Sequence, residues 1–124
     1  MTTGEEVLRR LSIGDPSFYR ALVAAELREP LQGLDARSVA LVQLGGVIST
    51  GAAGPVWQQY VHNARLAGLS LDEVVGALAA MAPAIGFART VSAAPDLAHA
   101  LGYDIDAALE QLDEPARSPA GGGR

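Results

Sequence analysis

The chain has 124 residues, a mass of 12.8 kDa, a net charge of −5 and no cysteine. Absence of cysteine excludes disulfides, thiolate nucleophiles and sulfur-ligated zinc. All nine basic residues are arginines scattered along the sequence, so no basic stripe is present to neutralise the phosphates of a nucleic acid.

Length and hydropathy predict one soluble domain. A chain of this size buries a single core, and none of its apolar runs approaches the roughly 20 residues that span a membrane. The polar, acidic start "MTTGEEVLRR" is unlike a secretory signal, so we expect a cytoplasmic protein. The domain is expected over residues 1–114, followed by a disordered tail over 115–124, where "PARSPAGGGR" lacks apolar anchors.

Two short helices are predicted at the N-terminus. Thr3 followed by Glu6 has the spacing of a capping box, and the helix that it begins ends at Gly14. Asp15 and Pro16 are typical of an N-cap and a first helical residue, and the second helix is expected to end before Pro30.

The third predicted helix begins after Asp35 and contains the run "LVQLGGVI". Its apolar side chains point nearly all round the helix axis, which predicts a central, buried position. Gly45 and Gly46 lie inside this run, where each costs about 1 kcal/mol relative to alanine. We therefore expect a neighbouring helix to need the space that they leave.

The fourth predicted helix carries His62, with Pro55 in its first turn and Gly68 closing it in the left-handed conformation. The next helix has the clearest start in the chain. Ser70 and Glu73 form a capping box, while the flanking Leu69 and Val74 have the spacing of a hydrophobic staple.

Prolines divide the rest of the predicted helical region. Pro83 is interpreted as a break, after which a helix resumes to about Ala93. Pro95 then begins a short helix that ends at Gly102, and Asp104 caps a last segment, "IDAALEQL". No alternating strand pattern competes anywhere, so the predicted fold class is all-α.

The candidate site residues surround His62. Gln58, His62 and Arg65 share one face of their helix, which is either a solvated face or the wall of a pocket. In the pocket interpretation, His62 acts as a general acid or base, because its unperturbed pKa near 6.5 suits proton transfer at neutral pH. Arg65 or Arg89 then holds a substrate carboxylate. Gln58, Tyr60 or Trp57 then shapes the pocket wall, while the alternative for Trp57 and Tyr60, which share another face of the helix, is packing in the core or at an interface.

Metal and cofactor sites are not predicted. The two histidines, His62 and His99, are far apart in the sequence, and neither has a His-x-x-x-His pattern or a carboxylate cluster nearby. The loop "GAAGP" lacks the dinucleotide fingerprint and the lysine of a phosphate-binding loop. His99, near the end of a short helix, is interpreted as a structural residue.

The order of these features resembles the carboxymuconolactone decarboxylase family, which includes the alkylhydroperoxidase D-like proteins. The similarity covers about residues 34–112, through "LDARSVALVQL", "YVHNARLAGLSLDEVVGAL" and "APAIGFARTVSAAPDLAHALGYDIDAAL". Its most diagnostic residues are His62, Ala64, Gly68, Ser70, Asp72 and Glu73. The resemblance implies a compact multi-helix fold of the alkylhydroperoxidase D type and a homo-oligomer, a trimer or a hexamer.

This chain departs from the family pattern at the residues that carry its chemistry. The two cysteines of the peroxidase branch would fall at Pro55 and Gln58, so thiol peroxidase chemistry is excluded. The acidic residue often seen on the preceding helix would fall near Ala40 or Gln43, which disfavours true carboxymuconolactone decarboxylase activity.

Two functions remain open at this stage. The first is a catalytically silent oligomer that binds a ligand or a partner. The alternative is a cofactor-free lyase, isomerase or decarboxylase that acts on a small acidic or lactone-like metabolite, with His62 as general acid or base.

Overall fold

The computed structural model of the protein describes residues 3–24, 33–103, 110 and 112. The regular elements within these residues are helices: α1 (Gly4–Ser12), α2 (Pro16–Ala24), α3 (Ala36–Thr50), α4 (Gly54–Leu66), α5 (Leu71–Ile85) and α6 (Phe87–Leu101). The all-α prediction is confirmed. None of these helices is long and apolar enough to cross a membrane.

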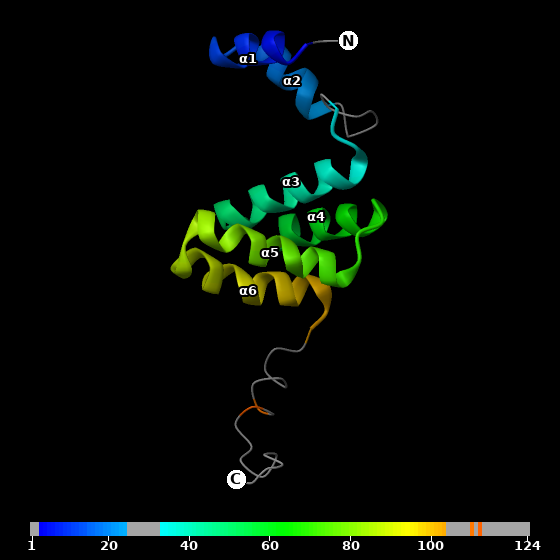
Figure 1. The fold of residues 1–124 in the computed structure, drawn as a ribbon, viewed down its shortest axis with the longest axis vertical. Helices are drawn as coiled ribbons and strands as arrows, with labels where there is room; N and C mark the ends of the chain where they lie inside the picture. The colour runs from blue at the N-terminus through cyan, green and yellow to red at the C-terminus, as the bar shows by residue number, and fades with distance from the viewer. Residues whose placement is uncertain (1–2, 25–32, 104–109, 111, 113–124) are drawn as a thin grey trace.

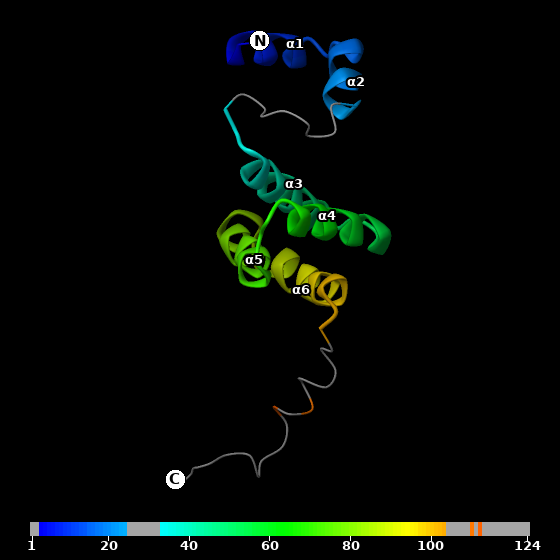
Figure 2. The ribbon, with the colours of Figure 1, turned by 90° about the vertical axis from the view of Figure 1, so that its right-hand side faces the viewer.

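Helices α3 to α6 form a bundle around one hydrophobic core (Figures 1 and 2). Helix α3 packs against α4 and α5, and α6 closes the arrangement by packing against the same two helices. The largest fully buried side chains come from α3, α4 and α5: Leu44, Ile48, Trp57 and Val74.

Helices α1 and α2 pack against each other and stand apart from the bundle in both views. Neither helix contains a buried residue. Apolar side chains on them stay largely open to solvent, among them Leu8 at 69% and Val23 at 63% exposure.

The predicted starts of α2, α3 and α5 are confirmed. The Asp35 carboxylate accepts the backbone N–H of Ser38 at 2.8 Å, and that of Asp15 accepts the N–H of Ser17 at 3.0 Å. At α5 the capping box is complete: the Ser70 hydroxyl accepts the Glu73 N–H at 3.0 Å, and the Glu73 carboxylate accepts the Ser70 N–H at 2.8 Å.

The α1 start is only half a capping box. Thr3 Oγ1 accepts the Glu6 N–H at 3.2 Å, as expected. The Glu6 carboxylate, however, accepts hydrogen bonds from Arg9 and Arg10, because these cations lie one turn further along the same helix. Charge pairing therefore replaces the second capping bond.

Gly68 ends the His62 helix as predicted. Its φ is +91°, a backbone conformation that side chains other than glycine's resist. The Gly68 N–H donates to the Arg65 carbonyl at 3.0 Å, and the Leu69 N–H donates to the Ala64 carbonyl at 3.1 Å. This pair of bonds is a Schellman motif, and it turns the buried Leu69 into the core beside Ala64.

The expectation that α3 is buried all round is wrong on one side. Val42 is 64% exposed and Gly46 is also exposed, because no helix of the described residues covers that edge. The two glycines differ accordingly. A Cβ at Gly45 would lie 3.2 Å from the Met81 Sδ of α5, as expected of a close helix contact, whereas a Cβ at Gly46 would meet nothing within 4 Å.

Two predictions about the prolines are wrong. Helix α5 continues through Pro83 to Ile85, and the break falls at Gly86 instead, whose φ is +87°. Helix α6 continues through Pro95, so no separate helix begins there. Both prolines are exposed. In α6 the buried Ala93 and Leu97 hold the helix to the core, and this packing outweighs the local free-energy cost of the proline ring.

Several predicted features lie outside the described residues. These are the end of the second helix near Pro30, the cap at Asp104, most of the last segment and the tail over 115–124.

Candidate functional site

The polar stripe predicted on the His62 helix is present on α4. Gln58, His62 and Arg65 are all exposed, on a face of α4 that flanks its buried residues. Among the described residues, no hydrogen bond or ion pair involves the His62 ring, so no neighbouring carboxylate holds it in one orientation. The structure therefore places three of the predicted site residues together on an open surface.

The two aromatic residues of the predicted site lie elsewhere. Trp57 is 1% exposed and belongs to the core, where its indole Nε1 has no hydrogen-bond partner among the described residues. Tyr60 is half-buried and lines a cleft beside α2. The structure does not bring Trp57 and Tyr60 into one wall with His62.

Arg89 belongs to α6, and its guanidinium contacts Gly51 at the C-terminal end of α3. A Cβ built on Gly51 would lie 2.5 Å from Arg89 Nη1, so a larger residue there would force the guanidinium to shift, and the φ of +70° also favours glycine. Arg89 Nη2 donates to the Ser92 hydroxyl at 2.8 Å. A cation at the C-terminal end of α3 complements the helix dipole, which gives this arginine a structural role.

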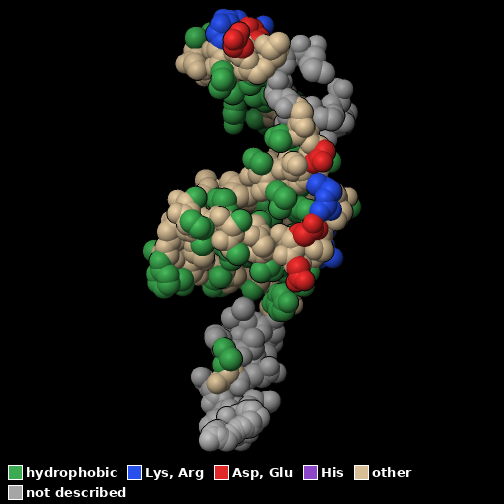
Figure 3. All heavy atoms as spheres, viewed as in Figure 1, with side chains coloured by type: hydrophobic (Ala, Val, Ile, Leu, Met, Phe, Trp, Pro, Cys, Tyr) green, Lys and Arg blue, Asp and Glu red, His purple; other side chains and the backbone are tan. Residues whose placement is uncertain are grey.

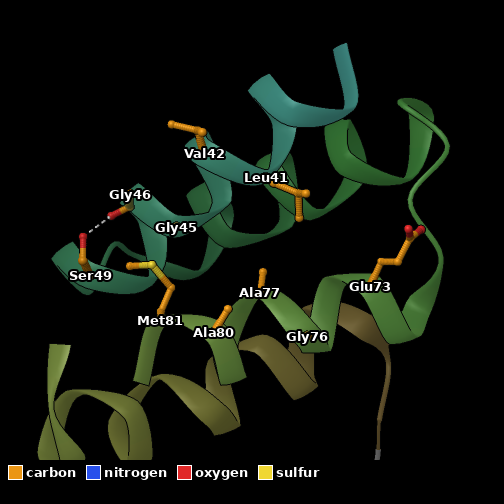
Figure 4. Close-up of a pocket in the computed structure, with 10 residues that line it drawn as sticks. All are labelled: Leu41, Val42, Gly45, Gly46, Ser49, Glu73, Gly76, Ala77, Ala80 and Met81. Carbon is orange, nitrogen blue, oxygen red and sulfur yellow. Dashed lines mark hydrogen bonds between the residues drawn. The ribbon is translucent and has the colours of Figure 1, made fainter. Parts of the chain in front are cut away.

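Two hollows stand out in the described part of the chain, and His62 is not among the described residues that line these two. The first, which we call the α3–α5 groove, has a volume of about 620 Å³. Small and aliphatic side chains dominate its lining, as Figure 4 shows. The lining residues are Leu41, Val42, Gly45, Gly46, Ser49, Glu73, Gly76, Ala77, Ala80 and Met81.

The polar groups in the α3–α5 groove already have partners. The Ser49 hydroxyl donates to the Gly46 carbonyl at 3.0 Å (Figure 4). The Glu73 carboxylate pairs with the Arg37 guanidinium, whose Nη1 also donates to the Gly68 carbonyl at 2.7 Å. The described lining of the groove is thus an apolar surface whose one carboxylate is paired.

Arg37 joins the start of α3 to the loop before α5, a role that sequence reasoning missed. The Ser70 N–H and then the Arg37 side chain hold the pKa of Glu73 below its usual range, against an opposing effect of desolvation. No sequence signal identified this pair, because the two residues are 36 positions apart. In Figure 3 the charged side chains of the bundle gather at one end, and the rest of the visible face is largely uncharged.

The second hollow, which we call the α2–α3–α4 cleft, has a volume of about 720 Å³. Its lining combines aliphatic side chains with amides and one phenol. The lining residues are Leu22, Val23, Ala36, Ala40, Gln43, Gln59, Tyr60, Asn63, Leu66 and Ala67. Gln43, Gln59 and Asn63 were not among the predicted site residues, because the cleft that they line forms only when α3 and α4 pack together.

No group of three or more histidine, aspartate or glutamate side chains that could hold a metal ion occurs in the described part of the chain. Comparison with protein-family models, with curated proteins and with solved structures found no match to this chain. The resemblance to the carboxymuconolactone decarboxylase family therefore stays a prediction.

Proposed function

We propose that the protein is a catalytically silent, self-associating helical protein that binds a ligand. The observation that carries this proposal is the position of His62, which is exposed and lines neither hollow. A general acid or base has to reach its substrate within hydrogen-bond distance, in a site that excludes water. The hollows of the described residues are lined by neutral or already paired groups instead.

The family resemblance is part of the same proposal. It is supported by the order of local features: a capped α3, the His62-bearing α4 closed at Gly68, and the complete capping box at Ser70. A family scaffold that lacks the cysteines and the usual carboxylate would keep these packing features while losing its chemistry.

Self-association is assigned to the α3–α5 groove, with a second copy of the chain as the occupant. The exposed Val42 lines the groove together with Gly46, Gly76 and Ala80, whose side chains are small or absent, so one face offers both an apolar side chain and space to receive its copy in a two-fold contact. The groove's carboxylate is paired with Arg37, so a contact at this face brings no unpaired carboxylate of the described lining between the copies.

The silent character is tested by His62→Gln, which keeps polarity and approximate size. A screen of small carboxylic acids and lactones should find no turnover that the substitution removes, with helical content unchanged. A loss of roughly 10²- to 10⁴-fold in any turnover, the usual contribution of general acid–base catalysis, would contradict the proposal. That result would favour the alternative, a lyase, isomerase or decarboxylase in which Arg65, one turn from His62, holds the substrate carboxylate.

Assembly is tested by light scattering at micromolar concentration. We expect a mass above the 12.8 kDa of one chain, and a decrease towards that mass in Val42→Asp, because an unpaired charge would be buried between the copies. Val91→Asp is the matched control, since Val91 is 51% exposed on α6 and lines neither hollow. A monomeric wild type, or equal masses of the wild type and the Val42→Asp variant, would remove the assignment.

A further inference from the structure

The α2–α3–α4 cleft differs from the α3–α5 groove in the state of its polar groups. Among the described residues, no hydrogen bond uses the Gln43 amide or the Tyr60 hydroxyl, although both residues are half-buried. Gln59 Nε2 donates to Asn63 Oδ1 at 2.9 Å, which leaves the Gln59 carbonyl and the Asn63 amino group for another partner. Donors and acceptors are therefore both available on one wall of the cleft.

The rest of the cleft is apolar. Leu22 and Val23 of α2 lie on one side, and Ala40 and Leu66 contribute aliphatic surface from α3 and α4. Its volume of about 720 Å³ falls within the range of roughly 300–1,000 Å³ that is usual for small-molecule sites. An apolar wall with a few convergent polar groups is the usual composition of such a site.

Charge decides which ligands fit. Among the described residues that line the cleft there is no charged side chain, so an ionised carboxylate would lose water against this lining without gaining a counter-charge. The net charge of −5 disfavours the approach of anions as well. A neutral amide has no such cost, and its carbonyl and amino groups match the amides of Gln43, Gln59 and Asn63.

We infer that the α2–α3–α4 cleft is a binding site for a small uncharged molecule with an apolar body and an amide-like head. This inference rests on the proposed function, because it names the ligand class of a silent binding protein. Its ligand differs from the acidic metabolite that the alternative function implies.

The test uses benzamide and benzoate, which have nearly the same shape and differ in charge. In two-dimensional NMR of the full-length protein, benzamide should shift the side-chain amide signals of Gln43, Gln59 and Asn63. Benzoate should bind at least about tenfold more weakly, because its charge is desolvated without a counter-charge. Gln43→Leu and Tyr60→Phe should each weaken benzamide binding about threefold to tenfold, the effect of one lost hydrogen bond.

Thr50→Val is the control, because Thr50 lies in α3, the helix of Gln43, but does not line the cleft. The substitution removes a hydroxyl that donates to the Gly46 carbonyl at 3.0 Å. It should leave benzamide binding unchanged. Equal or tighter binding of benzoate, or an absence of benzamide binding, would overturn the inference. A turnover that His62→Gln abolishes would overturn the proposed function instead, so the two failures are distinguishable. If Gln43→Leu does not fold, Tyr60→Phe decides the test.

Discussion

Gly45 and Gly46 are neighbours in α3 with different surroundings. Both have helical φ values, so neither is needed for its backbone conformation. A Cβ at Gly45 would lie 3.2 Å from Met81 Sδ, closer than ordinary van der Waals contact, while a Cβ at Gly46 would meet open space. Helix propensity therefore acts alone at Gly46 and competes with packing at Gly45.

We predict that Gly46→Ala raises the free energy of unfolding by up to about 1 kcal/mol, the usual difference between alanine and glycine inside a helix. Gly45→Ala should raise the free energy of unfolding by less, because the Met81 side chain has to move. Urea denaturation followed by circular dichroism measures both values. The denaturation is measured at a protein concentration where both variants have the same oligomeric mass, because Gly46 lines the α3–α5 groove assigned to self-association. A Gly45→Ala variant as stable as Gly46→Ala would contradict the packing argument.

The side chain of Glu6 makes the stability of α1 depend on pH. Arg9 and Arg10 donate to its carboxylate at 2.7 and 2.8 Å and lower its pKa from 4.5 to about 2. A depressed carboxyl pKa stabilises the folded state above the unfolded pKa, and this contribution is lost as the pH falls. The stabilisation of α1 by Glu6 is thus complete above about pH 4.5 and disappears towards pH 2.

An NMR titration of the Glu6 carboxyl carbon should show a midpoint near 2. In an Arg9→Gln, Arg10→Gln double variant the midpoint should move up towards 4.5, because both hydrogen-bond donors have lost their charge. The same midpoint in the wild type and the double variant would show that the arginines are not its cause.

At the scale of the element, α6 contains a proline that its packing tolerates. Pro95 is exposed, and it cannot donate a hydrogen bond to the carbonyl of Val91 one turn earlier. The helix continues because Ala93 and Leu97 hold it to the core on the other side. The cost of the proline is therefore still present in the folded protein.

We predict that Pro95→Ala stabilises the protein by on the order of 1 kcal/mol. An interior proline costs roughly 3 kcal/mol relative to alanine, and the greater freedom of the unfolded variant offsets part of the gain. Pro55→Ala is the control, since Pro55 lies in the first turn of α4, where no backbone donor is needed. Equal effects of the two substitutions in urea denaturation would refute the prediction.

Helix ends were predictable because their signals are local. Asp35, Gly68 and the Ser70–Glu73 capping box each act within a few residues, so sequence spacing is sufficient. The continuation of α6 through Pro95 was not predictable, because it depends on contacts with other helices that override local preference.

At the scale of the whole molecule, the sequence predicted the class of fold but not the arrangement of its helices. The apolar pattern of α3 predicted contacts on more than one side, as found with α4 and α5, whereas the pairing of Arg37 with Glu73 emerged only in three dimensions. The same holds for the candidate site. The stripe of His62 could be read from helical spacing, whereas the α2–α3–α4 cleft brings Leu22 and Gln43 together from separate helices.

The closed arrangement of α3 to α6 has a consequence for folding kinetics. Two of its closest contacts join helices that follow each other directly, α3 with α4 and α5 with α6, so the chain makes them without closing a long loop. Such local topologies fold on the order of microseconds to milliseconds. Trp57, the chain's single tryptophan, is buried in this core and reports the event by fluorescence after rapid dilution from urea. A main refolding phase slower than about one second would mean that joining the two helix pairs, through the contacts of α3 with α5 and of α4 with α6, limits the rate.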